Sequence, residues 1–379
     1  MSSYAGNTDM STFKYNQRLQ KTSIRLLKVV PDPDLNLLTI QLVEVDLGKA
    51  EFEALSYVWG DQTKKITIDC NGKRLEIGAN LYSALHERRR RNPGTALWAD
   101  QVCINQDDVE EKTCQVRLMS TIYAKANQVI VWLGEQEHGD LDGLHLMEDL
   151  YEKCHGKQYD ANAGIFEFHN FDYKAKGVPN PAFNPTWNSL FKILSNPWFG
   201  RVWVVQELLS AQKSVIWKGS LDLNTHPVLW TAMLIGRHKN LYENYDISMG
   251  SPQVSALMAR NIAASYFDTK TRGPRPIYDT LSRYSGMSAT EPRDRFFALV
   301  GVSTGLDEAF VDYTKTFEEV ACLVGKMTLL GTLKYGLAEN GTELLILENS
   351  PGKHRFPIEW LAFHANPQNH VSSHARTVS

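Results

Sequence analysis

Runs of β-favouring residues near the start of the chain predict three strands. They cover residues 24–30, 38–45 and 52–59. The Pro-Asp repeat at 31–34 is typical of a turn, so the first two runs predict a hairpin. A second hairpin is predicted over 66–77, because Asn71-Gly72 supplies the positive φ angles that a two-residue turn needs. Residues 1–20 are polar and lack apolar periodicity, which predicts a disordered tail.

Helical and strand patterns then alternate along the chain. Helical spacing covers residues 80–90 and 109–126, and apolar strand runs cover residues 96–104, 128–133 and 214–217. Such alternation is typical of βα units on a largely parallel sheet. The predicted fold class is therefore α/β, a mostly parallel sheet with flanking helices and an added N-terminal β-hairpin.

The pattern weakens over residues 135–185, where Gly, Asn, Asp and Pro cluster around one short helical stretch, and this predicts an insertion. Helical spacing returns over 187–194 and again over 198–211. From about residue 236 the apolar periods are mostly helical. The predicted organisation is a tail over 1–20, an α/β domain over 21–235, a helical region over 236–365 and a loose tail over 366–379.

The charges nearly balance: 40 Lys and Arg residues against 43 Asp and Glu residues give a formal net charge of -3. Nothing electrostatic therefore favours a nucleic-acid or anionic-membrane partner. The five cysteines are scattered and form no CxxC pair, unlike the framework of a small secreted domain. No apolar run approaches the ~20 residues of a membrane helix, so no membrane segment is expected. We expect a cytoplasmic protein with reduced cysteines.

One carboxylate stands out in the helical stretch RVWVVQELL, residues 201–209. Glu207 has mostly apolar neighbours, and Trp203 lies one turn earlier on the same face. A carboxylate in a largely buried helix needs a partner or a function. Three interpretations are open: an ion pair with an arginine such as Arg201, a place on the wet stripe of the helix, or a catalytic acid.

Two strand ends supply polar and aromatic side chains. The first, LSYVWGD, contains Ser56, Tyr57, Trp59, Gly60 and Asp61, and the second, LWADQVCINQ, contains Asp100 and Asn105. Ligands usually dock at the carboxyl ends of strands in open α/β sheets, so both segments are candidate binding sites. The structural alternative is a half-buried strand end followed by a turn. Cys103 has no nearby histidine base and is expected to be a small buried thiol.

The motifs of several common sites are absent. The 11 histidines form no HExxH and no paired ligand spacing, so no metal site is expected. Neither GxxxxGK[ST] nor GxGxxG occurs, which argues against the common phosphate-binding loops. Residues 292–295, PRDR, precede an apolar helix and predict a structural cap with ion pairing.

Five segments together resemble the fungal heterokaryon incompatibility (HET) domain. They are FEALSYVWGD from residue 52, LWADQVCINQ from 97, YAKANQVIVWLG from 123, NPWFGRVWVVQELL from 196 and PRDRFFALVG from 292. Their order and spacing match over roughly residues 24–302, which makes the resemblance specific. It implies a role in non-self recognition and regulated cell death in filamentous fungi.

HET domains are in turn similar to Toll/interleukin receptor (TIR) domains, whose enzymatic members cleave NAD, and this implies a flavodoxin-like sheet. The Trp-x-x-x-Glu-Leu pattern of TIR NAD hydrolases is matched here from Trp203, so the resemblance makes Glu207 the catalytic acid. The stretch 135–185 departs from TIR domains, which are tighter there. Positions assigned to NAD binding are Ser56, Tyr57, Trp59, Gly60, Asp61, Asp100, Asn105 and Trp203.

Cleavage between ribose and nicotinamide builds positive charge on the sugar, which a desolvated carboxylate stabilises. Nicotinamide leaves as a neutral molecule, so one carboxylate suffices. NAD is thus expected as substrate, without a cofactor or metal. Further expected partners are other copies of the chain in an active homo-oligomer and a protein sensor. The alternatives are a non-catalytic signalling or oligomerisation module, and a TIR-like enzyme acting on another nucleotide or on nucleic acid.

Overall fold

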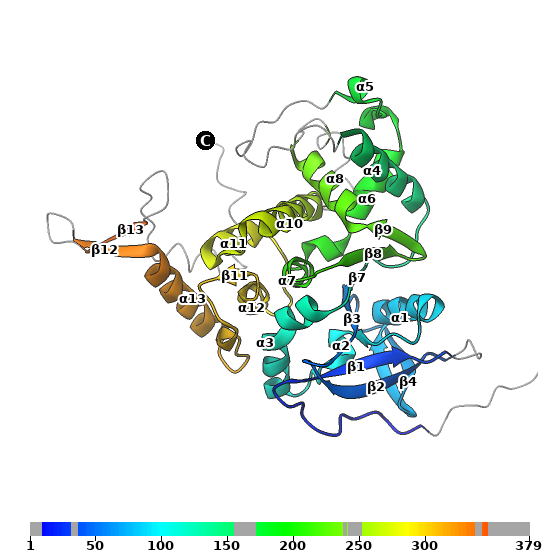
Figure 1. The fold of residues 1–379 in the computed structure, drawn as a ribbon, viewed down its shortest axis with the longest axis vertical. Coiled ribbons are helices and arrows are strands. Elements are labelled where there is room, and N and C mark those ends of the chain that lie inside the picture. The colour runs from blue at the N-terminus through cyan, green and yellow to red at the C-terminus, as the bar shows by residue number, and fades with distance from the viewer. Residues whose placement is uncertain are drawn as a thin grey trace, which may run out of the picture.

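The computed structural model describes residues 10–31, 37–154, 172–237, 241, 252–337 and 343–347 (Figure 1). A mixed sheet of nine strands lies at its centre, in the order β5-β4-β2-β1-β6-β3-β7-β8-β9. The strands are β1 (Ser23–Val29), β2 (Thr39–Asp46), β3 (Glu53–Tyr57), β4 (Lys65–Cys70), β5 (Lys73–Gly78), β6 (Leu97–Trp98), β7 (Val129–Trp132), β8 (Ser214–Lys218) and β9 (Leu221–Asn224).

Four neighbouring strands in the middle of the sheet, β6-β3-β7-β8, are all parallel. Numbered by their sequence among themselves, they run 2-1-3-4, which is the beginning of the flavodoxin-like order. After β3 the chain forms β6 on one side of this strand and then crosses over to form β7 on its other side. The topological switch point of the sheet therefore lies between β3 and β7. The predicted α/β class is confirmed.

Both predicted hairpins are present. Strands β1 and β2 pair antiparallel, from Ser23 opposite Asp46 to Val29 opposite Ile40. Strands β4 and β5 are joined by Asn71 and Gly72, whose φ angles of 54° and 76° provide the left-handed backbone that this turn requires. The hairpins extend the parallel core on the side of β6.

The helices up to the end of the domain are α1 (Ala79–Arg91), α2 (Asp100–Cys103), α3 (Val109–Lys125), α4 (Asp140–Cys154), α5 (Tyr173–Lys176), α6 (Thr186–Leu194), α7 (Trp203–Leu209) and α8 (Thr225–Arg237), with 3-10 turns η1 (Pro181–Phe183) and η2 (Pro197–Gly200). The helix expected over 109–126 is α3, and Asp108 caps it by accepting from the backbone of Glu110 and Glu111. The stretch 135–185 contributes α4, α5 and η1, while residues 155–171 lie outside the described part.

Two predicted elements differ from the structure. The strand expected over 96–104 is limited to β6, because the chain turns into α2, where the amides of Val102 and Cys103 donate to Ala99. The helix expected over 198–211 is divided into η2 and α7. Arg201 between them is extended and forms a β-bridge with Ser288, a partner 87 residues away that local spacing does not reveal.

Residues 10–20 of the predicted tail lie against the domain. The backbone of Phe13 donates to Arg74, at the edge of the sheet. Tyr15 donates to the carbonyl of Val102, and Leu19 is buried. We call residues 10–20 the N-terminal strap; residues 1–9 lie outside the described part.

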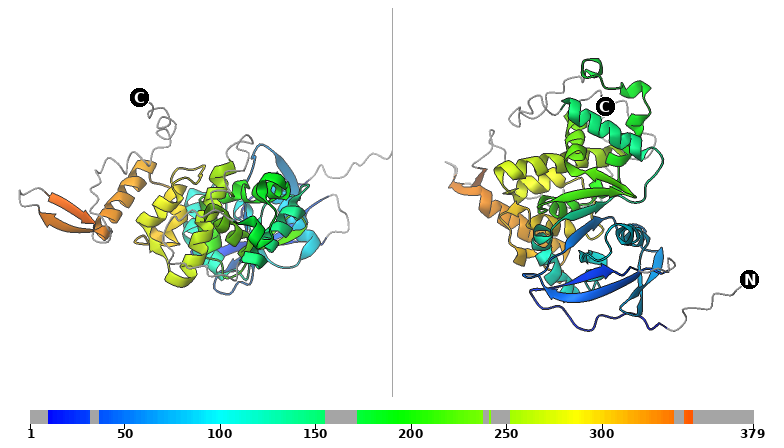
Figure 2. Two further views of the ribbon diagram at one scale, coloured as in Figure 1. Left: turned by 90° about the horizontal axis from the view of Figure 1, so that it is seen from above. Right: turned by 45° about the vertical axis from the view of Figure 1, so that its right-hand side comes forward.

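The region from residue 252 to 332 is mostly helical, as predicted. Its elements are α10 (Pro252–Arg272), α11 (Ile277–Tyr284), α12 (Asp294–Val300), η4 (Glu308–Phe310) and α13 (Phe317–Thr332), with the short strands β10 (Arg275–Pro276) and β11 (Ser303–Thr304). Helix α13 leads away from the body to an additional hairpin of β12 (Leu333–Leu337) and β13 (Glu343–Leu347), which projects from the molecule (Figure 2). The loose tail expected over 366–379 is outside the described residues. None of the described helices is long and apolar enough to cross a membrane.

Candidate functional site

Ser56 and Glu207 meet in the interior, although 151 residues separate them. Ser56 lies in β3, a central strand whose residues from Ala54 to Tyr57 are all buried. Glu207 lies in α7, which packs against β3 and α3. Glu207 is only 2% exposed and Ser56 only 1%. The candidate acid therefore lies near the carboxyl end of β3, beside the topological switch point where ligands dock in such sheets.

Three side chains form a hydrogen-bond relay that fixes the Glu207 carboxylate. The indole Nε1 of Trp198 donates to Ser56 Oγ at 2.8 Å. Because an indole N–H can only donate, Ser56 accepts this bond and commits its single proton to Glu207 Oε2. Ser56 is thereby engaged as donor and acceptor in a buried position. This arrangement makes Ser56 a support for Glu207 and leaves little capacity for a ribose hydroxyl.

The other oxygen of Glu207, Oε1, has no hydrogen-bond partner in the described part of the chain. The unpaired hydroxyl of Tyr57 is sealed from solvent, whereas Glu207 Oε1 is not. Oε1 therefore has residual access to solvent. The relay holds one carboxylate oxygen in place, and the second accepts no hydrogen bond from the described residues, although the side chain as a whole is only 2% exposed.

The pKa of Glu207 is raised from 4.5 to about 7, chiefly by burial and to a smaller extent by the nearby charge of Asp100. The positive charge of Arg201 and the hydrogen bond from Ser56 oppose this rise. Arg201 nevertheless forms no ion pair with Glu207 among the described residues; its guanidinium donates to the carbonyl of Tyr57. The described residues therefore do not form the ion pair of the structural alternative, and a pKa of about 7 suits an acid or base that acts near neutral pH.

A second carboxylate lies at the end of the neighbouring strand. Asp100 Oδ2 accepts from Trp59 Nε1 at 2.9 Å, which joins the segments that follow β3 and β6. Burial raises the pKa of Asp100, and Arg201 counteracts this rise. Burial and the charge of Asp100 hold the pKa of Tyr57 well above its usual value. The structure therefore brings together Ser56, Tyr57, Trp59, Asp100 and Glu207.

Three other predicted site residues, Gly60, Asp61 and Trp203, form no hydrogen bond with Glu207 or Asp100 among the described residues. Asp61 is exposed and accepts from the backbone and hydroxyl of Thr63. Gly60 precedes it with a φ of 68° in the turn after β3. The indole of Trp203 donates to Asp294 of the C-terminal region. Contacts of this kind stabilise turns and helix packing. The assignment of these three residues to NAD binding stays a prediction.

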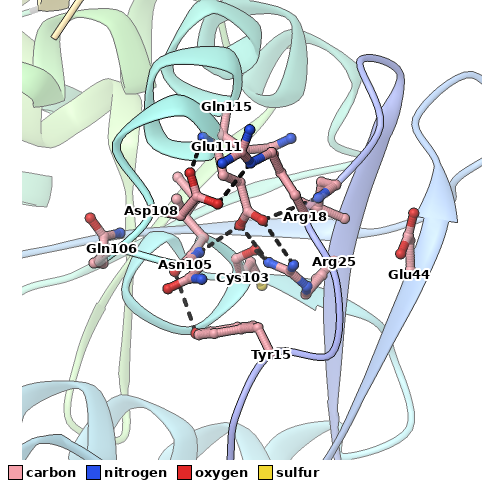
Figure 3. Close-up of polar contacts among 12 residues, drawn as sticks. Tyr15, Arg18, Arg25, Glu44, Cys103, Asn105, Gln106, Asp108, Glu111 and Gln115 are labelled. Atoms are coloured by element: carbon pink, nitrogen blue, oxygen red, sulfur yellow. Dashed lines mark hydrogen bonds and ion pairs between the residues drawn. The ribbon is translucent and has the colours of Figure 1, made fainter. Parts of the chain in front are cut away.

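Asn105 belongs to a different polar cluster, at the base of α3 (Figure 3). Its backbone donates to Glu111, which is fully buried and pairs with Arg25 at 2.6 Å. Tyr15 of the N-terminal strap lies over the Arg25 guanidinium, 4.5 Å from it. Burial raises the pKa of the adjacent Cys103 thiol to about 12, so it is an inert thiol. The cluster fastens the strap to the loop that follows α2.

Sequence reasoning missed Trp198 in the relay. It belongs to NPWFG, where Asn196 caps η2 by accepting from the Trp198 backbone and donates its amide to Leu133. This cap directs the Trp198 ring toward β3. The available signal was an Asn-Pro-Trp turn directly before the Glu207 helix. No group of three or more His, Cys, Asp or Glu side chains suited to a metal occurs among the described residues.

Comparison with known proteins finds a match in the middle of the chain. Residues 52–207 match the family model described as heterokaryon incompatibility protein (HET). The chain is 34% identical over 192 residues to Heterokaryon incompatibility protein 6, OR allele, of Neurospora crassa. That match covers 41% of this chain and 26% of the relative, so it spans about a quarter of that protein. No solved structure matches the chain. The matched segment begins just before β3 and ends at Glu207.

Proposed function

We propose that the protein, whose residues 52–207 match the heterokaryon incompatibility (HET) family model, acts in heterokaryon incompatibility, as an effector of regulated cell death that hydrolyses NAD through Glu207. The similarity to Heterokaryon incompatibility protein 6, OR allele, of Neurospora crassa supports the first part. The observation that carries the second part is a buried carboxylate at the switch point of the sheet, with no ion pair and with one oxygen that has no hydrogen-bond partner among the described residues.

The proposed reaction breaks the bond between the ribose carbon C1′ and the nicotinamide nitrogen. Both bonding electrons go to nicotinamide, which leaves neutral, and positive charge develops on the sugar. Glu207 in its ionised form stabilises this charge from a site with little water. A water molecule then adds to C1′, and the carboxylate takes its proton, a transfer that suits an acid with a pKa near neutral.

The neighbours of Glu207 have distinct roles in this proposal. Ser56 and Trp198 hold Oε2, so that Oε1 faces the sugar. Trp59 and Asp100, joined by a hydrogen bond, form the part of the site that contacts the nucleotide. The proposal includes assembly of several copies in the active state, since sites of this kind can be completed across subunits.

The test is release of nicotinamide from NAD by the purified chain. The wild type should release nicotinamide, and Glu207→Ala should abolish the release. Glu110→Ala is the matched control, because Glu110 is an exposed glutamate in the first turn of α3. Equal turnover by the wild type and Glu207→Ala would reject the assignment. Stabilisation of the protein against heat by another nucleotide, but not by NAD, would redirect the proposal to that nucleotide.

A second candidate is a non-catalytic signalling module, which the low exposure of Glu207 favours. In that case the carboxylate is a structural acceptor for Ser56. Glu207→Gln separates the two functions, because glutamine keeps the shape and an accepting oxygen. A signalling module should still trigger incompatibility in the fungus with this variant, whereas the enzyme should not.

A further inference from the structure

Three hydrogen bonds reach the Glu207 helix from the region that follows the matched HET segment. The backbone of Val202 donates to the carbonyl of Ser288 at 3.1 Å. The indole of Trp203 donates to Asp294 Oδ2 at 2.9 Å. The backbone of Gly301 donates to the side chain of Gln206 at 3.3 Å. These bonds contact α7 at its start and at the residue directly before Glu207.

Asp294 and Gly301 lie at the two ends of one element. Asp294 is the first residue of α12, and Gly301 is the residue that ends it. Helix α12 therefore lies along α7 with one contact at each end, and the ribbon in Figure 1 places the two helices near each other. The sequence PRDRFFALVG, for which spacing predicts only a cap and a helix, covers both contacts.

The Asp294 contact is reinforced from behind. Tyr313 donates its hydroxyl to Asp294 Oδ1 at 2.6 Å, so both carboxylate oxygens are engaged. Arg293 donates to the carbonyl oxygens of Tyr313 and Lys315, at 2.7 and 2.6 Å, while it pairs with Glu291. The acceptor for Trp203 is therefore held in one orientation.

The Gly301 contact depends on close approach. A Cβ atom at this position would lie 2.3 Å from Ser120 Cβ in α3 and 2.9 Å from the Gln206 side-chain oxygen. Such distances are far below ordinary van der Waals contact. Only glycine lets the end of α12 lie against α3 and α7 together.

We propose that α12 is a clamp on α7, and that Asp294 and Gly301 are positioning residues that hold the Glu207 carboxylate against Ser56. Trp203 is then the contact point of the clamp, in place of the NAD-binding role to which the sequence analysis assigns it. The support of α7 by α12 is argued from these contacts alone. Only the effect of the clamp on catalysis rests on the proposed function.

Hydrogen–deuterium exchange of the α7 amides in the full chain tests the clamp directly. Trp203→Phe keeps a ring and removes the donor, and Asp294→Ala removes the acceptor. Each should make the α7 amides exchange about tenfold faster, as expected for the loss of one hydrogen bond to a charged group. Asp294→Asn keeps an accepting oxygen and should restore most of the protection. The double variant should exchange no faster than either single variant.

Asp279→Ala is the control, because Asp279 is an exposed carboxylate on α11 of the same region. It should leave α7 exchange unchanged. Wild-type exchange in both Trp203→Phe and Asp294→Ala, or equal acceleration by the control, would overturn the clamp.

Kinetics on NAD separate positioning from substrate contact. The clamp predicts that Trp203→Phe and Asp294→Ala lower kcat several-fold and leave KM unchanged. A raised KM in Trp203→Phe alone would instead indicate that the ring contacts the substrate, and would overturn the positioning role. If the wild type does not hydrolyse NAD, the proposed function fails, and the exchange measurement still decides on the clamp.

Discussion

Replacement of Glu207 by glutamine should stabilise the protein, and more so as the pH rises. Burial raises the pKa of Glu207 from 4.5 to about 7. The folded protein therefore retains this proton at pH values where the unfolded chain has lost it. Stability from the protonated form is fully present below pH 4.5, declines as the pH rises toward about 7, and is constant above it.

The magnitude follows from the two pKa values. A pKa difference of one corresponds to about 1.4 kcal/mol, so ionised Glu207 lowers the free energy of unfolding by about 3 kcal/mol at alkaline pH. About 2 kcal/mol of this cost develops between roughly pH 5.5 and pH 8.5. Glutamine has no such charge and still accepts a hydrogen bond from Ser56. The change with pH therefore isolates the charge from any effect of packing.

Urea denaturation of the wild type and Glu207→Gln over this pH range measures the difference. The stability advantage of the variant should grow by about 2 kcal/mol from the acidic to the alkaline end. Asp61→Asn is the control, because hydrogen bonds from Thr63 lower the pKa of the exposed Asp61, so its replacement acts in the opposite direction. An advantage that stays constant or shrinks with pH would refute the assignment of a buried, unneutralised carboxylate.

Two further predictions concern the relay at Glu207 and the buried Arg25–Glu111 pair, the latter with Arg18→Met as its control. Ser56→Ala removes the hydrogen bond that lowers the pKa of Glu207. The acidic limb of the profile of kcat/KM against pH should therefore move to higher pH by about one unit. An acidic limb at the wild-type position would contradict the relay. Arg25→Met leaves Glu111 buried without its cation and should lower the free energy of unfolding by about 3–5 kcal/mol in urea denaturation. Arg18→Met, in an exposed pair, should cost much less than Arg25→Met, and equal costs would contradict the burial argument.

Local patterns were sufficient to predict the sheet core and the candidate acid. The apolar run of β3 and the Asn71-Gly72 turn are set by neighbours in sequence, so their prediction is confirmed. The apolar surroundings of Glu207 likewise predicted its burial. The meeting of Glu207 with Ser56 depends on the order of strands in the sheet, which one sequence does not specify.

Contacts between distant segments account for the differences. Spacing places Trp203 on the same side of the helix as Glu207, but the direction of its indole is set by Asp294, 91 residues later. The polar composition of the strap predicted disorder, whereas Tyr15 and Leu19 anchor it to the domain. Two or three anchoring side chains leave no periodic signal, because the strap is neither a helix nor a strand.

The most direct test of the central claim is the crystal structure of Glu207→Gln with NAD bound. The proposed mechanism predicts the ribose C1′ within van der Waals distance, on the order of 4 Å, of the side chain at position 207, with Trp59 and Asp100 beside the nucleotide. NAD bound elsewhere on the molecule, or a side chain at position 207 that stays enclosed without the nucleotide, would contradict it.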